Sequence, residues 1–167
     1  MGKYLITGRQ GSGKTTLIKF LQEQGYTAFN TDDLPDVTRL QDRQTGEVID
    51  WPEGGVDWTK YAWNWQEQAL KNLLATNDTV FVGGVVSNQA DLYDLFDKVF
   101  VLIVDAKTLR TRLETHEHQS HHLPGVIDRI LTNHEIKQKL FVEDGGIPIS
   151  ANGTAAEIAD AILSQAQ

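Results

Sequence analysis

Residues 8–15 of this chain read Gly-Arg-Gln-Gly-Ser-Gly-Lys-Thr and fit the pattern G-x-x-x-x-G-K-[ST] at every fixed position. The mainly apolar run of residues 4–7 before them is typical of a strand, and the apolar spacing after them predicts a helix. A glycine-rich turn between a strand and a helix exposes successive backbone N–H groups beside the positive end of the helix. The sequence therefore predicts a turn that binds a nucleoside triphosphate, in which Lys14 reaches the β- and γ-phosphates and the Thr15 hydroxyl ligates Mg²⁺.

Length and composition are typical of one globular domain, since the chain has 167 residues, of which 40% are apolar and 23% are charged. The formal net charge of −8 argues against a broad surface for a nucleic-acid polymer or a membrane, because either surface would need clustered lysine and arginine. There are no cysteines, which excludes disulfides and cysteine-ligated zinc. No apolar run has the length of a membrane span and no signal-peptide pattern is present, so we expect a cytoplasmic protein.

Strand-like runs alternate with helical periodicity along the whole chain, a pattern typical of a parallel α/β sheet. After the first strand, further strands are expected at residues 26–30, 79–82, 98–104 and 147–150. The expected helices cover about residues 14–24, 87–96, 107–115, 127–140 and 155–162.

Residues 34–58 differ from the rest because prolines and glycines interrupt a polar stretch. We interpret this stretch as a long excursion with a short helix, and long loops in compact domains are usually functional. Over residues 59–75, two adjacent apolar stripes predict one helix with a wide apolar face, which places Trp63 and Trp65 in the core.

The order of the elements, the loop G-x-x-G-S-G-K-T and the carboxylates after the second strand resemble the P-loop small-molecule kinases, which include adenylate kinase and shikimate kinase. Residues 83–89, with the tryptophan-rich segment upstream, are also similar to a group of bacterial kinase-like ATPases of the AAA type. The resemblance implies a three-layer α/β fold with a five-stranded parallel sheet of order 2-3-1-4-5. It further implies a single domain over residues 1–167, an acceptor-binding insertion at about 34–75, and a lid at about 116–126.

For the nucleotide, the resemblance implies ATP and Mg²⁺ as cofactors and a binding site over the start of the first helix. The residues that would hold the triphosphate are Gly8, Gly11, Ser12, Gly13, Lys14, Thr15 and Thr16. Arg112 matches the arginine that opens the lid and is expected to be catalytic together with Lys14, and Arg110 is a further candidate. Asn152 belongs to a loop that matches the one edging the adenine. Histidines occupy positions 116, 118, 121 and 122, where the family carries more arginines, and we interpret them as solvated loop residues.

For the acceptor, the resemblance points to Asp32, which matches a carboxylate near the acceptor hydroxyl or the metal and is the third residue expected to be catalytic. Its upstream partner in the family pattern D-x-D is Asn30 in this chain, which departs from that pattern. The exposed aromatic rings of the excursion could stack on a planar acceptor, or could pack the excursion onto the body. The acceptor-binding candidates are Asp32, Asp33, Arg39, Trp51, Trp58 and the glycine pair Gly83 and Gly84, which would let an acceptor approach the third strand.

Asp105 follows the apolar run of residues 101–104 and allows two interpretations. An apolar strand that ends in aspartate is the form of a second nucleotide motif, whose carboxylate ligates Mg²⁺. Alternatively, Asp105 is the N-cap of the helix that follows.

These observations favour a kinase that moves the γ-phosphoryl group of ATP to a small-molecule acceptor, most simply a nucleoside or a nucleotide, as a monomer or homodimer. An arginine-poor lid favours the alternative of an ATP-binding regulatory module or slow ATPase without an acceptor, because arginine stabilises the transferring group. A nucleic-acid-linked ATPase is a third hypothesis, which the acidic composition disfavours.

Overall fold

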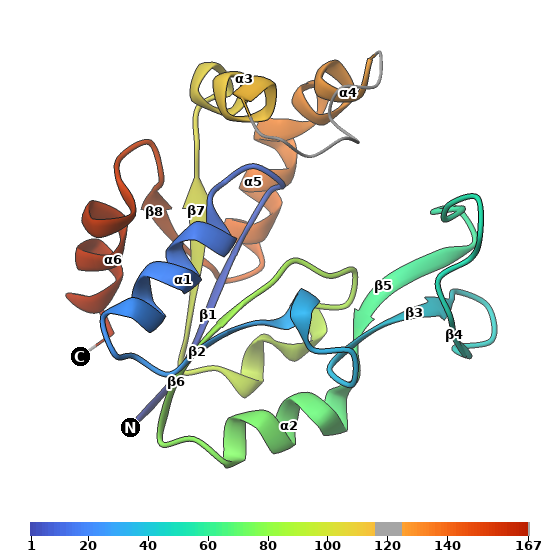
Figure 1. The fold of residues 1–167 in the computed structure, drawn as a ribbon, viewed down its shortest axis with the longest axis horizontal. Helices are drawn as coiled ribbons and strands as arrows, with labels where there is room; N and C mark the ends of the chain where they lie inside the picture. The colour runs from blue at the N-terminus through green and yellow to red at the C-terminus, as the bar shows by residue number, and fades with distance from the viewer. Residues whose placement is uncertain (116–124, 167) are drawn as a thin grey trace.

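A computed structural model of the chain describes residues 1–115 and 125–166 (Figure 1). Its centre is a parallel sheet with the strand order β2-β6-β1-β7-β8. Numbered among themselves, these five strands have the order 2-3-1-4-5, which confirms the expected topology. The strands are β1 (Gly2–Gly8), β2 (Ala28–Asn30), β6 (Thr79–Gly83), β7 (Lys98–Ile103) and β8 (Ile147–Ser150).

Helices cover both faces of this sheet, because successive strand residues point to opposite sides and both sides are apolar. In β1, Tyr4 and Ile6 join the core under α1 (Lys14–Glu23) and α6 (Ala155–Leu163), whereas Leu5 joins the core under α2 (Glu67–Ala75) and the 3₁₀ helix η2 (Ala90–Leu95). Three more helices continue from the carboxyl end of β7: α3 (Ala106–Thr115), α4 (Val126–Thr132) and α5 (His134–Glu143). None of the helices in the described ranges has the length and apolarity needed to cross a bilayer.

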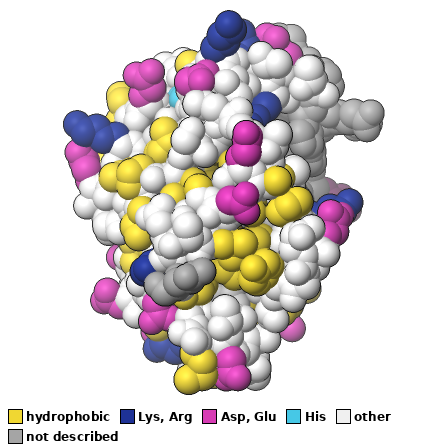
Figure 2. Space-filling model, turned by 90° about the vertical axis from the view of Figure 1, so that its left-hand side faces the viewer, with side chains coloured by type: hydrophobic (Ala, Val, Ile, Leu, Met, Phe, Trp, Pro, Cys, Tyr) yellow, Lys and Arg dark blue, Asp and Glu magenta, His cyan; other side chains and the backbone are white. Residues whose placement is uncertain are grey.

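The surface on the α6 side carries charges of both signs (Figure 2). Lysine and arginine side chains are scattered singly on this face among aspartate and glutamate, with apolar side chains between them.

The prediction of one helix over residues 59–75 is wrong. Tyr61–Trp65 form the strand β5, and only Glu67–Ala75 are helical. β5 pairs antiparallel with β3 (Thr38–Asp42), which also pairs with β4 (Val48–Ile49). The excursion therefore contributes two strands to a three-stranded sheet rather than forming a short helix. The apolar residues come from a strand and from the helix that follows it after Gln66. Their combined spacing happens to match the period of a single helix.

Two further helix predictions change in detail. The helix expected over 87–96 is the shorter 3₁₀ helix η2. Asn88 lies outside it, and its side chain accepts from the main-chain N–H of Trp65 and donates to the carbonyl of the same residue, both at 3.0 Å. Ser87 adds a main-chain bond to the carbonyl of Trp63 at 2.8 Å, so β5 is fastened to the loop after β6. The helix expected over 127–140 is divided at Asn133 into α4 and α5. The predicted lid and its four histidines lie outside the described residues, apart from residues 125 and 126.

Candidate functional site

The glycine-rich turn between β1 and α1 closes around the ammonium group of Lys14. The Nζ atom donates to the carbonyl of Gly8 at 2.7 Å and to that of Arg9 at 3.0 Å. Gly11 and Gly13 have φ angles of 81° and 97°, in the left-handed region that favours glycine. The first turn of a helix leaves its N–H groups without helical carbonyl partners, and α1 presents those of residues 14–16 beside the positive end of its dipole. The turn therefore has the form of an anion site centred on one lysine.

The charge state of Lys14 is adjusted by its surroundings. Burial in the turn lowers the pKa of Lys14 to about 8, the negative charge of Asp32 acts in the opposite direction, and the positive charge of Arg9 lowers the pKa further. Lys14 follows β1 and Asp32 follows β2, so both lie at the carboxyl edge of the same parallel sheet. The structure thus brings together two of the three residues predicted to be catalytic.

Arg112, the third predicted catalytic residue, lies on the face of α3 that packs against the turn. Its guanidinium donates to the carbonyl of Ser12 at 3.2 Å and to that of Ala151 at 2.6 Å, joining the turn to the end of β8. Gly11 permits this packing, since a Cβ there would lie 2.6 Å from the Cδ1 atom of Leu109. Arg112 is therefore positioned at the edge of the anion site without a carboxylate partner among the described residues.

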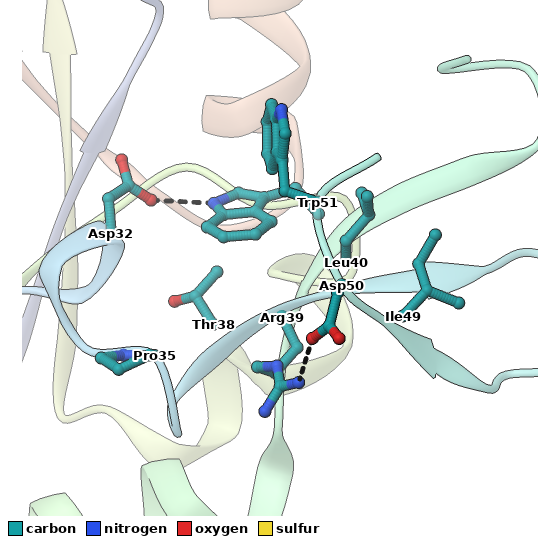
Figure 3. A pocket seen from close by; sticks show the side chains of 9 residues that line it. Asp32, Pro35, Thr38, Arg39, Leu40, Ile49, Asp50 and Trp51 are labelled. Atoms are coloured by element: carbon teal, nitrogen blue, oxygen red, sulfur yellow. Dashed lines mark hydrogen bonds and ion pairs between the residues drawn. The ribbon is translucent and has the colours of Figure 1, made fainter. Parts of the chain in front are cut away.

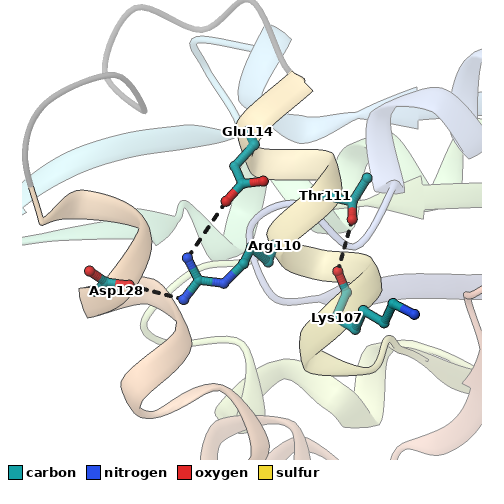
Figure 4. Close-up of polar contacts among 5 residues, drawn as sticks. All are labelled: Lys107, Arg110, Thr111, Glu114 and Asp128. Carbon is teal, nitrogen blue, oxygen red and sulfur yellow. Dashed lines mark hydrogen bonds and ion pairs between the residues drawn. The ribbon is translucent and has the colours of Figure 1, made fainter.

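Arg110 points to a different neighbour, although the sequence suggested that it binds the nucleotide. It forms ion pairs with Asp128 of α4 at 3.0 Å and with Glu114 at 3.6 Å (Figure 4). Residues two apart in a helix lie on nearly opposite faces, so Arg110 cannot reach the turn while Arg112 does. Arg110 therefore connects α3 with α4 in this structure, and its predicted contact with the nucleotide stays a prediction.

Asp105 caps α3, as one of its two interpretations predicted. Its carboxylate accepts from the Thr108 main-chain N–H at 2.7 Å and from the Thr108 hydroxyl at 3.1 Å, and these bonds lower the pKa of Asp105. Asn152, predicted to edge the adenine, accepts from the main-chain N–H of Asp105 at 3.0 Å and is exposed.

Arg9 contributes a further positive charge to the turn that the sequence analysis did not single out. Its Nε atom is buried without a hydrogen-bond partner, and no described carboxylate pairs with its guanidinium. Burial lowers the pKa of Arg9, and the nearness of Arg9 in turn lowers the pKa of Lys137 on α5. The sequence did offer a signal for this charge, because Arg9 occupies a variable position inside the phosphate-binding pattern.

An open pocket of about 340 Å³ lies between the 3₁₀ turn at residues 31–33 and the small antiparallel sheet (Figure 3). Its volume is at the lower end of the range for small-molecule sites. The residues that line it are Asp32, Pro35, Thr38, Arg39, Leu40, Ile49, Asp50, Trp51 and Trp63. Three of the predicted acceptor residues, Asp32, Arg39 and Trp51, therefore share one pocket.

Tryptophan side chains form one corner of this pocket. Trp63 donates from its indole nitrogen to the Oδ1 atom of Asp32 at 2.9 Å, and Trp51 meets it edge to face, with ring centroids 5.8 Å apart and an interplanar angle of 81°. Trp58 meets Trp51 edge to face, with ring centroids 6.1 Å apart, and does not line the pocket. Sequence reasoning missed Trp63 because it assigned that residue to the core, whereas only Trp65 is fully buried.

Gly83 and Gly84, which were predicted to let an acceptor approach, are buried under protein side chains and do not line the pocket. A Cβ on Gly83 would lie 2.6 Å from the Cγ1 atom of Ile18, and one on Gly84 would lie 2.4 Å from the hydroxyl oxygen of Thr31. A larger residue would not fit at either position, because α1 and the 3₁₀ turn at residues 31–33 pack directly on the end of β6. Asp33 does not line the pocket either; its carboxylate accepts from the Asn30 side chain at 3.2 Å.

The residues at the turn fit a magnesium ion that is held mainly by phosphate. Thr15 is exposed at the start of α1, and Asp32 is exposed across the site. Within the described ranges, no three histidine, cysteine, aspartate or glutamate side chains are grouped so that they could hold a metal. Mg²⁺ commonly takes one or two protein ligands together with water and substrate phosphates. Thr15 and Asp32 therefore suit a magnesium ion that arrives with a triphosphate.

A phosphate-binding turn at the carboxyl edge of a 2-3-1-4-5 parallel sheet defines a kinase-like P-loop protein. The chain belongs to the AAA domain family, whose family model matches residues 5–136. No curated protein matches the chain at a significant level.

Solved structures of small-molecule kinases share this fold. Shikimate kinase from Bacteroides thetaiotaomicron is 17% identical, with 99% of this chain and 98% of that chain covered and a TM-score of 0.62. A gluconokinase from Sinorhizobium meliloti 1021 is 19% identical, with 98% and 90% covered and a TM-score of 0.56. The deoxyadenosine kinase from M. mycoides with bound dATP is 16% identical, with 98% of both chains covered and a TM-score of 0.53. The predicted resemblance to P-loop small-molecule kinases is confirmed at the level of the fold.

Proposed function

We propose that the protein is an ATP- and Mg²⁺-dependent kinase that phosphorylates a hydroxyl group of a small molecule. The observation that carries the proposal is the adjacency of two sites: the lysine-centred turn and the pocket that contains Asp32. The turn follows β1 and Asp32 follows β2 at the same carboxyl edge of the parallel sheet, so a phosphoryl group at the turn would face an acceptor in the pocket. A binding module without an acceptor would not need this second cavity.

The turn would hold the triphosphate through charge and positioning. Main-chain N–H groups of Gly13 to Thr16 and the Lys14 ammonium would neutralise phosphate oxygens, and phosphoryl transfer depends mainly on this kind of stabilisation. On nucleotide binding, Lys14 would exchange its bonds to two carbonyls for bonds to phosphate. Arg112 would lie beside the phosphates from α3. A magnesium ion held by Thr15 and, through a water molecule, by Asp32 would neutralise further phosphate charge.

Asp32 would accept the proton of the attacking hydroxyl group. One carboxylate oxygen, Oδ1, is oriented by the indole N–H of Trp63, which leaves Oδ2 to bind the acceptor hydroxyl. As the new oxygen–phosphorus bond forms and the bond to the leaving ADP breaks, the hydroxyl proton would pass to this oxygen. Trp63 would act as a positioning residue, because it contacts the carboxylate and fixes its direction.

A nucleoside or a nucleotide is the acceptor class that the exposed tryptophan best supports. Trp51 lines the pocket with 60% of its surface accessible, and stacking of a base on an aromatic ring contributes about 1–3 kcal/mol. The deoxyadenosine kinase among the similar folds bears the name of such an activity, but its identity of 16% supports the fold alone.

A second candidate function is an ATP-binding regulatory module or a slow ATPase. The observation that favours it is the ion pairing of Arg110 with Asp128 and Glu114, which leaves Arg112 as the one arginine of α3 at the turn. Arginine on the transferring group is worth about 10³–10⁵ in rate in GTPases, so a reduced set favours slow turnover.

Incubation with ATP labelled at the γ-phosphate and a panel of nucleosides, nucleotides and hydroxy acids separates the two functions. We expect labelled phosphoacceptor from at least one member, and loss of about 10²–10⁴ in the transfer rate for Asp32→Asn, since general base catalysis contributes that factor. The variant should retain ATP binding, which calorimetry would measure. Label released only as inorganic phosphate with every acceptor would reject the kinase and support the ATPase.

A further inference from the structure

The acceptor pocket contains an ion pair of its own. Arg39 is the one cationic side chain among the described residues that line it, and its Nη2 atom lies 3.8 Å from the Oδ1 atom of Asp50 (Figure 3). Asp32 is the second carboxylate of the lining. With one positive and two negative charges, the lining has a net charge of −1, and its single cation already faces a carboxylate.

The cationic side chains of the turn, Lys14, Arg9 and Arg112, do not line the pocket and in the proposed reaction would face the triphosphate. The Lys14 ammonium is bonded to the carbonyls of Gly8 and Arg9, and in the proposed reaction it is committed to the triphosphate. The Trp63 N–H contacts Asp32, so it is not free to donate to an acceptor phosphate or carboxylate. An acceptor with a negative charge would therefore find only Arg39 to pair with in the pocket, and that cation already faces Asp50. Like charges at close range disfavour binding.

The apolar part of the pocket is suited to a flat molecule. Trp51 and Trp63 are nearly perpendicular and form a corner of two indole rings. Trp51 leaves 60% of its surface in contact with solvent in the empty protein. A planar ring placed on that surface would remove apolar area from water and gain stacking energy without needing a charge.

We propose that this pocket selects an acceptor that has a planar ring and carries no negative charge, such as an unphosphorylated nucleoside, over nucleotides and hydroxy acids. This inference rests on the proposed kinase function and narrows its acceptor class. The selection combines an attractive element, the exposed face of Trp51, with a repulsive one, the excess carboxylate of Asp32 and Asp50.

Matched pairs of ligands test the charge rule. Calorimetry on the full chain, loaded with Mg²⁺ and a non-hydrolysable ATP analogue, would compare five common nucleosides with their 5′-monophosphates and with gluconate as a hydroxy acid. We expect the best nucleoside to bind at least about tenfold more tightly than its monophosphate. Asp50→Asn removes one negative charge and frees Arg39, so it should reduce this ratio at least about threefold. Asp160→Asn, a matched change on the exposed surface of α6, should leave the ratio unchanged.

Tryptophan variants test the planar part of the proposal. Trp51→Ala should weaken nucleoside binding about tenfold, a loss within the range for one stacked base. Trp58→Ala changes the neighbouring ring, which does not line the pocket, and should weaken binding less than about threefold. Equal effects of the two variants would contradict a stacking role for Trp51.

The outcomes separate this inference from the proposed function. Tighter binding of a monophosphate or of gluconate than of any nucleoside, or an unchanged ratio in Asp50→Asn, would overturn the charge rule while leaving a kinase. A protein that binds the ATP analogue but no acceptor of either charge would overturn both and would support the regulatory module.

Discussion

Nucleotide binding above neutral pH should be accompanied by uptake of a proton at Lys14. In the empty turn, burial lowers the pKa of Lys14 from the ordinary value of 10.5 to about 8. Phosphate oxygens beside the ammonium group favour its charged form, so a bound triphosphate should return the pKa to about 10.5 or above. Because only the charged form pairs with phosphate, a lysine that is neutral in the free protein must gain a proton when the nucleotide binds.

The expected stoichiometry follows from the two pKa values. With a pKa of about 8 in the free protein, Lys14 is about 10% neutral at pH 7, about half neutral at pH 8 and about 90% neutral at pH 9. Uptake should therefore rise from about 0.1 to about 0.5 and about 0.9 protons per nucleotide. Affinity should stay constant below pH 8 and fall nearly tenfold per pH unit above it. The full change from about 8 to 10.5 corresponds to at most about 3.4 kcal/mol, at 1.36 kcal/mol per pH unit.

Titration calorimetry in pairs of buffers with different ionisation enthalpies would measure this uptake at pH 7, 8 and 9. At pH 8 and 9 the phosphates themselves are fully ionised, so they contribute no protons. Lys14→Arg is the matched control, because a guanidinium stays charged throughout this range and should show no uptake. Lys137→Gln tests the second lysine whose pKa is lowered near the turn. A wild-type uptake near 0.1 at all three pH values would refute the inference that burial makes Lys14 partly neutral in the free protein.

Three other changes test packing and charge around the site. Gly84→Ala should lower the free energy of unfolding by about 1–3 kcal/mol in urea denaturation, because the new Cβ would lie 2.4 Å from the Thr31 hydroxyl oxygen; an unchanged midpoint would contradict this packing. His134→Ala should cost about 1–3 kcal/mol by thermal unfolding, since the buried ring bonds the Val104 carbonyl at 2.6 Å, and a loss below about 0.5 kcal/mol would be inconsistent with that bond. Arg9→Gln should raise the melting temperature of the empty protein, because it removes a half-buried guanidinium whose Nε atom has no hydrogen-bond partner. It should also weaken ATP binding about five- to tenfold. An unchanged melting temperature together with unchanged ATP affinity would contradict both expectations.

The parallel sheet and the turn were predictable because local patterns determine them. Each strand is a short apolar run, and the turn needs residues at fixed positions within eight consecutive places. The N-cap role of Asp105 was also one of two interpretations that the sequence offered. The bond from the Thr108 N–H at 2.7 Å decides between them.

The small antiparallel sheet could not be predicted in the same way, because its pairing is non-local. Thr38 pairs with Trp65, 27 positions further along the chain, and no local pattern encodes that register. One signal was present: aromatic residues at 61, 63 and 65 alternate with a period of two, which is typical of a strand. The helical spacing that continued into α2 concealed it.

Only part of the candidate acceptor site could be predicted, because several of its residues are brought together by the non-local pairing of the antiparallel sheet. Asp32 follows a strand at the ligand-binding edge of the sheet, so the general rule for α/β folds locates it. Trp63 and Asp50 join it only through the antiparallel sheet, which was not predicted. Conversely, the pair Gly83 and Gly84 suggested open space beside the strand. The sequence carries no information that the side chains of Ile18 and Thr31 fill the space next to these glycines.

β4 is only two residues long, so the segment around it is joined to the rest of the fold by few main-chain pairs. β4 attaches to β3 through the pairs of Leu40 with Ile49 and Gln41 with Val48, whereas β5 is anchored on both sides. Residues 43–60 therefore form a segment that carries Trp51 and Asp50 but little of the core. In the proposed kinase, exchange of this segment would redirect the activity to new acceptors while the nucleotide site remains unchanged.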